Sequence, residues 1–250
     1  MLFMNGAQNS HTWLALALGL TAAAANVAGG LLVARREWSR AWLKYFIALG
    51  AGFMLGASFL EMVPQAMELS GEIALVLVLA GYFLVHFFEH TLAPHFHFGE
   101  ETHVEELAHA HVPYTALAGL MIHAFFDGVA IASGFLVSEY LGGIVFVAVF
   151  LHKLPEGFTV ASLMLASGQG RRMAQLASVL LAAATIAGVL LMSFVPAQVG
   201  FALALSAGVT IYVAASDLMP EVNKEPGVRM AFVVFLGLGA IVALHYLLHV

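Results

Sequence analysis

The chain has 250 residues, of which 62% are hydrophobic and only 10% are charged, and its mean hydropathy is +0.94. Soluble domains average about 45–50% apolar and about 25% charged residues, so we expect this chain to lie in a lipid bilayer. The net charge of −6 argues against nucleic acid as a partner, and the absence of cysteine excludes disulfides, thiolate metal ligands and cysteine nucleophiles.

Eight apolar stretches are long enough to cross a bilayer, since a spanning helix needs about 20 mostly apolar residues. In chain order they are 11–34, 42–67, 72–92, 113–138, 141–168, 172–195, 199–219 and 228–250. Short turns such as Ser70-Gly71-Glu72 separate most of them, so neighbouring helices should run antiparallel. The sequence predicts an all-α membrane protein in which residues 1–250 form one transmembrane domain of eight helices in one bundle, with a longer loop at 93–112.

Basic residues mark the cytoplasmic loops of membrane proteins. Of the nine basic residues, Lys153 lies inside span 5. The other eight lie in or beside the loops between spans 1 and 2, spans 5 and 6, and spans 7 and 8. These loops share one side when eight spans alternate. We therefore expect them and loop 93–112 to be cytoplasmic, with both termini outside the cell membrane. An ionisable residue inside a span, such as Lys153, is a functional candidate by default.

Spans 4 and 5 carry the same pattern of polar residues. Span 4 reads HAFFDG from residue 123, and span 5 reads HKLPEG from residue 152. Residues i and i+4 share a helix face, so each helix offers one imidazole and one carboxylate in the same direction. The four candidate metal ligands are His123, Asp127, His152 and Glu156. Such donors suit Zn²⁺, Fe²⁺, Mn²⁺ or Cd²⁺. Hydrogen-bonded residues that clamp the two helices together are the alternative.

The similarity extends over HAFFDGVAIAS and HKLPEGFTVAS, which share the His, the acid, the Gly and a final Ala-Ser. Because consecutive spans are antiparallel, a motif repeat relates spans 4 and 5 through an approximate two-fold axis in the membrane plane. Inverted repeats around a midplane site are typical of transporters. His123 should lie about 15 Å from one end of its span and His152 about 16 Å from the opposite end of its own, near the middle of a ~30 Å core.

At these residues the sequence resembles the Zrt/Irt-like protein (ZIP) family of divalent metal transporters. HAFFDG resembles the family's fourth-span motif H-N-x-x-[DE]-G, and HKLPEG resembles its fifth-span motif H-[NDE]-x-P-E-G. The resemblance covers eight spans and a His-bearing cytoplasmic loop, here 93–112. It implies that the four candidate ligands form the primary metal site, with Met54 near it. An ordinary lipid-facing or packing methionine is the alternative for Met54. The resemblance also implies that Zn²⁺ moves into the cytoplasm, with Cd²⁺, Fe²⁺ and Mn²⁺ as further candidate ions. Dimers occur in the family, so a homodimer is compatible with the resemblance.

Two departures from the family pattern concern a second, bridged metal site found in many members. The positions after the two histidines are Ala124 and Lys153, and span 6 has no acid between 172 and 195. We therefore expect a single ion per chain. Lys153 is three residues before Glu156 and close to it on the helix, so its ammonium could stand where the second cation would lie. A simple pairing of Lys153 with Glu156 is the alternative.

Further polar residues lie toward the two ends of the bundle. Candidates for an outer acidic mouth are Glu61, Gln65 and Glu68 at the end of span 2. Candidates for an inner exit are His86, Glu89 and His90 of span 3 and Asp217 of span 7. Solvated helix ends are the alternative for both groups. The His- and Glu-rich loop 93–112 could buffer or sense cytosolic metal, or serve only as a solvated linker.

Two other functions use the same residues. An intramembrane metal hydrolase would need an open zinc position holding an activated water. The motifs lack the H-E-x-x-H arrangement of such enzymes, and the inverted repeat favours transport. We therefore expect no enzymatic activity. A passive metal-selective channel cannot be separated from a carrier on these residues.

Overall fold

The computed structural model describes residues 6–35, 40–92, 112–225 and 227–248, and the regular structure within these ranges is helical. The α-helices are α1 (Gly6–Arg35), α2 (Arg40–Ala57), α3 (Val63–Ser70), α4 (Ile73–Leu92), α5 (Val112–Val137), α6 (Glu139–Ala166), α7 (Arg171–Phe194), α8 (Val199–Tyr212), α9 (Met219–Asn223) and α10 (Val228–Leu248). Eight helical segments are long and apolar enough to span a membrane, which confirms the predicted fold class. The predicted loop 93–112 lies outside the described residues, except for the first residue of α5.

Two spans contain a wide π-turn just before a proline. η1 (Ser58–Met62) joins α2 to α3 ahead of Pro64, and η4 (Val213–Leu218) joins α8 to α9 ahead of Pro220. A proline lacks a backbone donor, and its ring crowds the carbonyl four residues earlier. That carbonyl lies inside the π-turn in both spans, which gives the ring room. π-Turns within α-helices often occur at functional sites.

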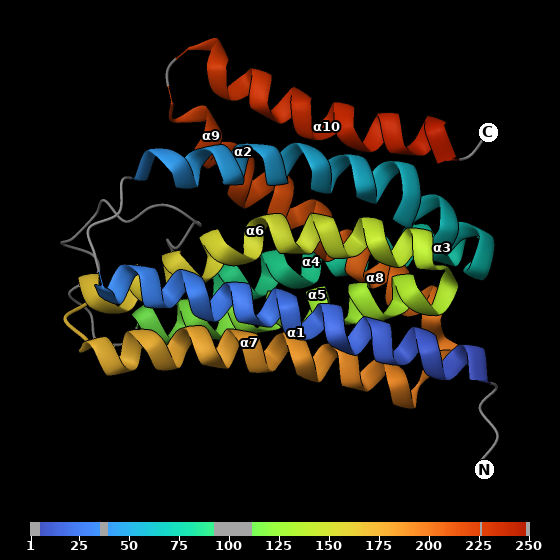
Figure 1. The fold of residues 1–250 in the computed structure, drawn as a ribbon, viewed down its shortest axis with the longest axis horizontal. Coiled ribbons are helices and arrows are strands. Elements are labelled where there is room, and N and C mark those ends of the chain that lie inside the picture. The colour runs from blue at the N-terminus through green and yellow to red at the C-terminus, as the bar shows by residue number, and fades with distance from the viewer. Residues whose placement is uncertain (1–5, 36–39, 93–111, 226, 249–250) are drawn as a thin grey trace.

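The helices pack as a layered bundle with α5 and α6 at its centre (Figure 1). α1 packs along α6 and α7, and α5 packs along α6, α7 and α8. On the other side of the bundle, α2 packs along α10 and α6, while α4 packs along α8. The first residues of α1 and the last of α10 lie at the same end, as eight alternating spans require (Figure 1).

The glycine that follows the acid in each motif has a clear packing role. A Cβ on Gly128 would lie 1.9 Å from the carbonyl oxygen of Thr185 in α7, and one on Gly157 would lie 1.9 Å from that of Asn26 in α1. Only glycine allows the backbones to approach this closely. Since consecutive residues are rotated by about 100° around a helix, the outer helices contact the glycine side and the neighbouring acids face elsewhere, toward the space between α5 and α6.

The predicted short turns are confirmed. Gly71 has φ of 67° between α3 and α4, and Gly168 has φ of 81° between α6 and α7. Positive φ values strongly favour glycine, because it has no Cβ. Residues 196–198 form a 3₁₀ turn between α7 and α8. These tight connections keep neighbouring spans side by side.

Candidate metal site

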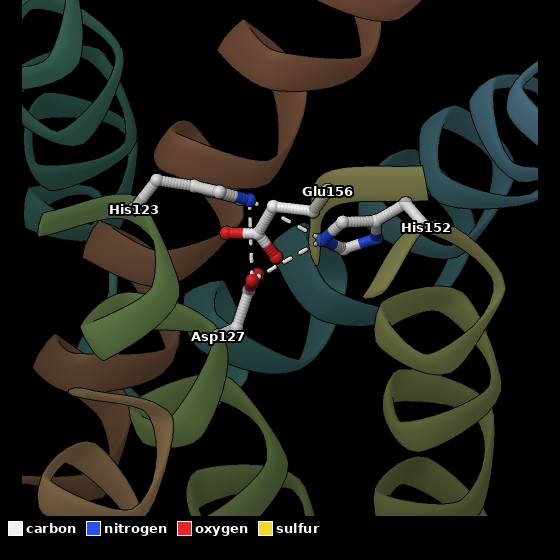
Figure 2. Close-up of side chains that lie close together, drawn as sticks. All are labelled: His123, Asp127, His152 and Glu156. Atoms are coloured by element: carbon white, nitrogen blue, oxygen red, sulfur yellow. Dashed lines mark hydrogen bonds and ion pairs between the residues drawn. The ribbon is translucent and has the colours of Figure 1, made fainter. Parts of the chain in front are cut away.

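The four predicted ligands converge between α5 and α6. One ligand atom from each side chain lies within 4.8 Å of the others. Figure 2 shows the two imidazoles and two carboxylates pointing toward one another. The side chains are almost inaccessible: relative exposure is 3% for His123, 1% for Asp127 and His152, and 0% for Glu156. We call these four residues the central cluster.

Three donor atoms of the central cluster form a nearly equilateral triangle. The Nε2 atoms of His123 and His152 are 3.2 Å apart, and Asp127 Oδ2 lies 3.1 Å from the first and 3.2 Å from the second. Donors bonded at about 2.0–2.1 Å to a tetrahedral zinc ion are separated by about 3.3 Å. The triangle therefore has the size of one face of a zinc coordination tetrahedron.

The ring of His152 is held in the orientation that a metal ligand needs. Its Nδ1–H donates to the backbone carbonyl of Ala148 at 3.1 Å, one turn earlier in α6. This bond leaves Nε2 to face Asp127 Oδ2 at 3.2 Å. A backbone partner that fixes the ring in this way is typical of metal-ligating histidines.

Lys153 lies beside the central cluster and is fully buried. Its Nζ is 2.5 Å from Glu156 Oε2, as the spacing predicted, and also 2.6 Å from Asp127 Oδ2 on the other helix. A buried ammonium between two carboxylates offsets part of their charge. The simple pairing with Glu156 is therefore only half of the arrangement, because Lys153 joins both motifs.

Each carboxylate of the central cluster has one paired and one unpaired oxygen among the described residues. Among the described residues, Asp127 Oδ1 and Glu156 Oε1 are buried and have no hydrogen-bond partner. Buried polar atoms normally have partners, so such atoms call for an explanation. In Glu156, Oε2 pairs with Lys153, while Oε1 is free to bind an ion. The cluster thus offers a fourth donor in addition to the triangle.

Met54 and Ala124 lie in the same packed core cluster of the bundle. Both are fully buried. A Cβ on Gly50, one turn before Met54 in α2, would lie 3.9 Å from His152 Cβ, so this face of α2 covers the cluster. Ala124 follows His123 and brings no donor atom to the cluster.

The predicted outer mouth divides into two parts. Glu61 is buried at 6% exposure in η1, where its Oε1 accepts hydrogen bonds from Tyr140 Oη at 3.1 Å and His245 Nδ1 at 2.8 Å. Gln65 and Glu68 form a separate exposed pair, joined by a 3.0 Å bond from Gln65 Nε2. Sequence reasoning missed Tyr140 and His245 as partners of Glu61. No local pattern links them, since they lie 79 and 184 positions away.

The predicted exit residues gather between α4 and α8. The rings of His86 and His90 are 4.0 Å apart, and Glu89 accepts a 2.7 Å hydrogen bond from the hydroxyl of Tyr212. Asp217 is buried in η4, and among the described residues its Oδ1 has no hydrogen-bond partner. The structure therefore brings together the predicted residues and adds Tyr212, which no sequence signal indicated.

The structure therefore combines eight helices long enough to span a membrane with a buried cluster of residues that could hold a metal ion. A family model described as "ZIP Zinc transporter" matches residues 99–245. The chain belongs to the ZIP zinc transporter family, as the motifs predicted, and the family's proteins are transporters rather than enzymes.

Individual relatives agree with this membership. The chain is 25% identical over 245 residues to zinc transporter ZIP9-B of Xenopus laevis, covering 78% of this chain and 80% of that protein. It is 34% identical over 122 residues to zinc transporter ZIP9 of Micropogonias undulatus, covering 44% and 39%. It is 32% identical over 116 residues to zinc transporter ZIP4 of Homo sapiens, covering 45% and 18%. The similarity to the last two therefore covers less than half of each chain.

Proposed function

We propose that this chain carries Zn²⁺ into the cytoplasm through a single site formed by the central cluster. The observation that supports this most is the triangle of donors, with edges of 3.1–3.2 Å, in the fully buried centre of the bundle. Zinc is proposed as the transported ion because the similar proteins are named zinc transporters. Imidazole and carboxylate donors also accept Cd²⁺, Fe²⁺ and Mn²⁺, which competition with Zn²⁺ would rank.

Lys153 supports the expectation of one ion per chain. Asp127, Glu156 and Lys153 together carry one net negative charge, and one divalent ion reverses it to one net positive charge. A second ion nearby would face both the first ion and the ammonium, which is unfavourable in a low dielectric. The fixed charge also weakens binding of the first ion, which favours its release. Two zinc ions per chain in native mass spectrometry would contradict this expectation.

The route proposed for the ion runs from the outer mouth through the central cluster to the exit residues. The outer mouth consists of Glu61, Gln65 and Glu68, and the exit consists of His86, Glu89, His90 and Asp217. Basic residues support the sidedness: the helix ends that carry Arg35, Arg40, Arg171 and Arg229 lie at one end of the bundle, opposite the start of α1 (Figure 1). By the positive-inside tendency that end is cytoplasmic, with both termini outside the cell membrane and loop 93–112 inside.

Transport into liposomes with a trapped zinc indicator tests the proposal. Wild-type protein should give saturable zinc influx, and His152→Ala combined with Glu156→Ala should abolish it by removing one imidazole and one carboxylate. Val76→Ala combined with Leu79→Ala is the control, because both side chains are more than half exposed on α4. Unchanged influx in the first variant would contradict the proposal. Influx that does not saturate would favour a channel over a carrier.

A further inference from the structure

The two π-turns carry matching sequences on antiparallel spans. Span 2 contains Glu61-Met62-Val63-Pro64, and span 7 contains Asp217-Leu218-Met219-Pro220. Each acid is buried in its π-turn three residues before the proline. Because one span is even and the other odd in chain order, the spans run in opposite directions. One acid therefore lies toward the end of the bundle that holds the termini, and the other lies toward the opposite end.

The two acids differ in their partners. Glu61 accepts hydrogen bonds from two other helices, through Tyr140 of α6 and His245 of α10. Asp217 has an oxygen without a hydrogen-bond partner among the described residues. The end of the bundle near the termini is thus tied together at its buried acid, while the corresponding acid at the other end retains a free oxygen.

Glu61 lies on the same span as the turn that faces the central cluster. Gly50, which faces His152, is followed by Met54 and Ser58 at α-helical spacings of four residues, and Glu61 follows Ser58 within the π-turn. Met54 and Ser58 have 0% exposure, and among the described residues the hydroxyl of Ser58 has no hydrogen-bond partner. Span 2 therefore carries a series of buried groups with sulfur and oxygen atoms between the turn that faces His152 and Glu61.

The partners of Glu61 come from parts of the bundle that pack differently. Tyr140 lies in the first turn of α6, the central helix that carries His152 and Glu156 and packs along α1, α5, α2 and α7. His245 lies in the last turn of α10, which packs mainly along α2. Because Glu61 accepts hydrogen bonds from both residues, it connects the first turn of α6 to the α2–α10 pair. Separating these elements requires both bonds to break.

We propose that Glu61, Tyr140 and His245 form a latch that closes the outer route to the central cluster. In the closed state, the two hydrogen bonds hold α6 and α10 against η1. An arriving divalent cation competes for the Glu61 carboxylate, releases Tyr140 and His245, and thereby exposes the series of buried groups that includes Ser58 and Met54. The proposal takes the central cluster of the proposed function as the end of this route, but its test needs neither zinc binding nor transport.

Thiol accessibility tests the latch, because the natural chain has no cysteine and Ser58→Cys provides a single, similarly sized reporter. The variant is reconstituted in liposomes, and an epitope tag identifies the side of the termini. A membrane-impermeant maleimide is then added on that side and, in parallel samples, on the opposite side. Tyr140→Phe or His245→Gln in this background should raise the labelling rate about five-fold for each hydrogen bond lost. Tyr246→Phe is the matched control, since it also removes one phenol hydroxyl but from an exposed ring.

The outcomes separate a latch from a static clamp. Faster labelling from the termini side with Tyr140→Phe and His245→Gln, and no change with Tyr246→Phe, supports the latch. Equal rates in all variants would overturn it, and so would an equal increase from both sides, which indicates general loosening. Thermal unfolding of each variant confirms that it is folded. Since no metal is present, failure of the latch leaves the proposed zinc site untouched, and failure of the zinc site leaves the latch measurement valid.

Discussion

The central helices α5 and α6 and the peripheral helices α4 and α10 are all apolar, but they place their side chains in different surroundings. In the spanning windows, 67% and 72% of the residues of α5 and α6 are buried, against 17% in both α4 and α10. The central pair buries four candidate ligands and a lysine, while the peripheral pair exposes phenylalanines such as Phe83 and Phe235. With lipid as solvent, apolar groups are stable outside, and charges are stable only where they have partners.

This comparison predicts that substitutions in the centre act through charge balance, whereas substitutions at the edge have little effect. The central charges offset one another as a group: two carboxylates and one ammonium leave one net negative charge, which a divalent ion reverses. Packing contributes as well, since Gly128 and Gly157 bring the neighbouring helices close around the cluster.

The largest effect is expected from Lys153→Met, which removes the ammonium between Asp127 and Glu156 and leaves two uncompensated buried charges. Without zinc, the free energy of unfolding should fall by about 3–5 kcal/mol. Added zinc should restore more stability than it adds to the wild type, because the ion then balances both carboxylates. Thermal unfolding of the purified protein with and without zinc measures both effects.

Lys44→Met is the control for Lys153→Met. Lys44 forms an ion pair with Glu225 that is about one-third exposed, so its loss should cost less than about 1 kcal/mol and should not depend on zinc. If Lys153→Met behaves like Lys44→Met, the buried ammonium does not balance the central charges, and the expectation of a single ion loses its physical basis.

Asp127→Asn should reduce zinc affinity by at least about 100-fold, since loss of an outer partner of a ligand already costs 10–100-fold. Asp127 Oδ2 contacts both histidine Nε2 atoms and Lys153, and asparagine keeps its size but not its charge. Isothermal titration with zinc measures the affinity. Glu139→Gln, in the first turn of the same helix as His152, should leave it unchanged. Equal affinities for the two variants would exclude Asp127 from the site.

Local patterns made the fold and the central cluster predictable. The apolar lengths of the spans indicate the eight helices, and the i, i+4 spacing places His152 and Glu156 on one face whatever the rest of the chain does. The spacing also predicted the contact of Lys153 with Glu156. It could not predict the contact with Asp127, which depends on how two helices cross.

Long-range partners account for what the sequence did not reveal. Tyr140 and His245 meet Glu61 through packing of residues far apart in the chain, and Tyr212 meets Glu89 in the same way. One signal was nevertheless present: Pro64 and Pro220 follow matching acids at the same spacing, which indicates a local change of helix geometry at both positions.

Gly157→Ala should lower the free energy of unfolding by about 1–3 kcal/mol, because the new methyl group forces α1 and α6 apart. Its Cβ would lie 1.9 Å from the carbonyl oxygen of Asn26. Gly143→Ala on the same helix meets nothing within 4 Å and should be neutral or slightly stabilising. Thermal unfolding compares the two variants. Similar unfolding temperatures would show that close packing behind the motif is not required.

The smallest effect is expected from Phe235→Ala on α10. This ring is 67% exposed, so its loss to lipid should change the free energy of unfolding by less than about 0.5 kcal/mol and leave zinc influx unchanged. Phe135→Ala removes the same ring from the core at 2% exposure and should cost about 3–5 kcal/mol. If Phe235→Ala is as destabilising as Phe135→Ala, the exposed face of α10 does not meet lipid but is covered by another protein surface, which a dimer of this chain would supply.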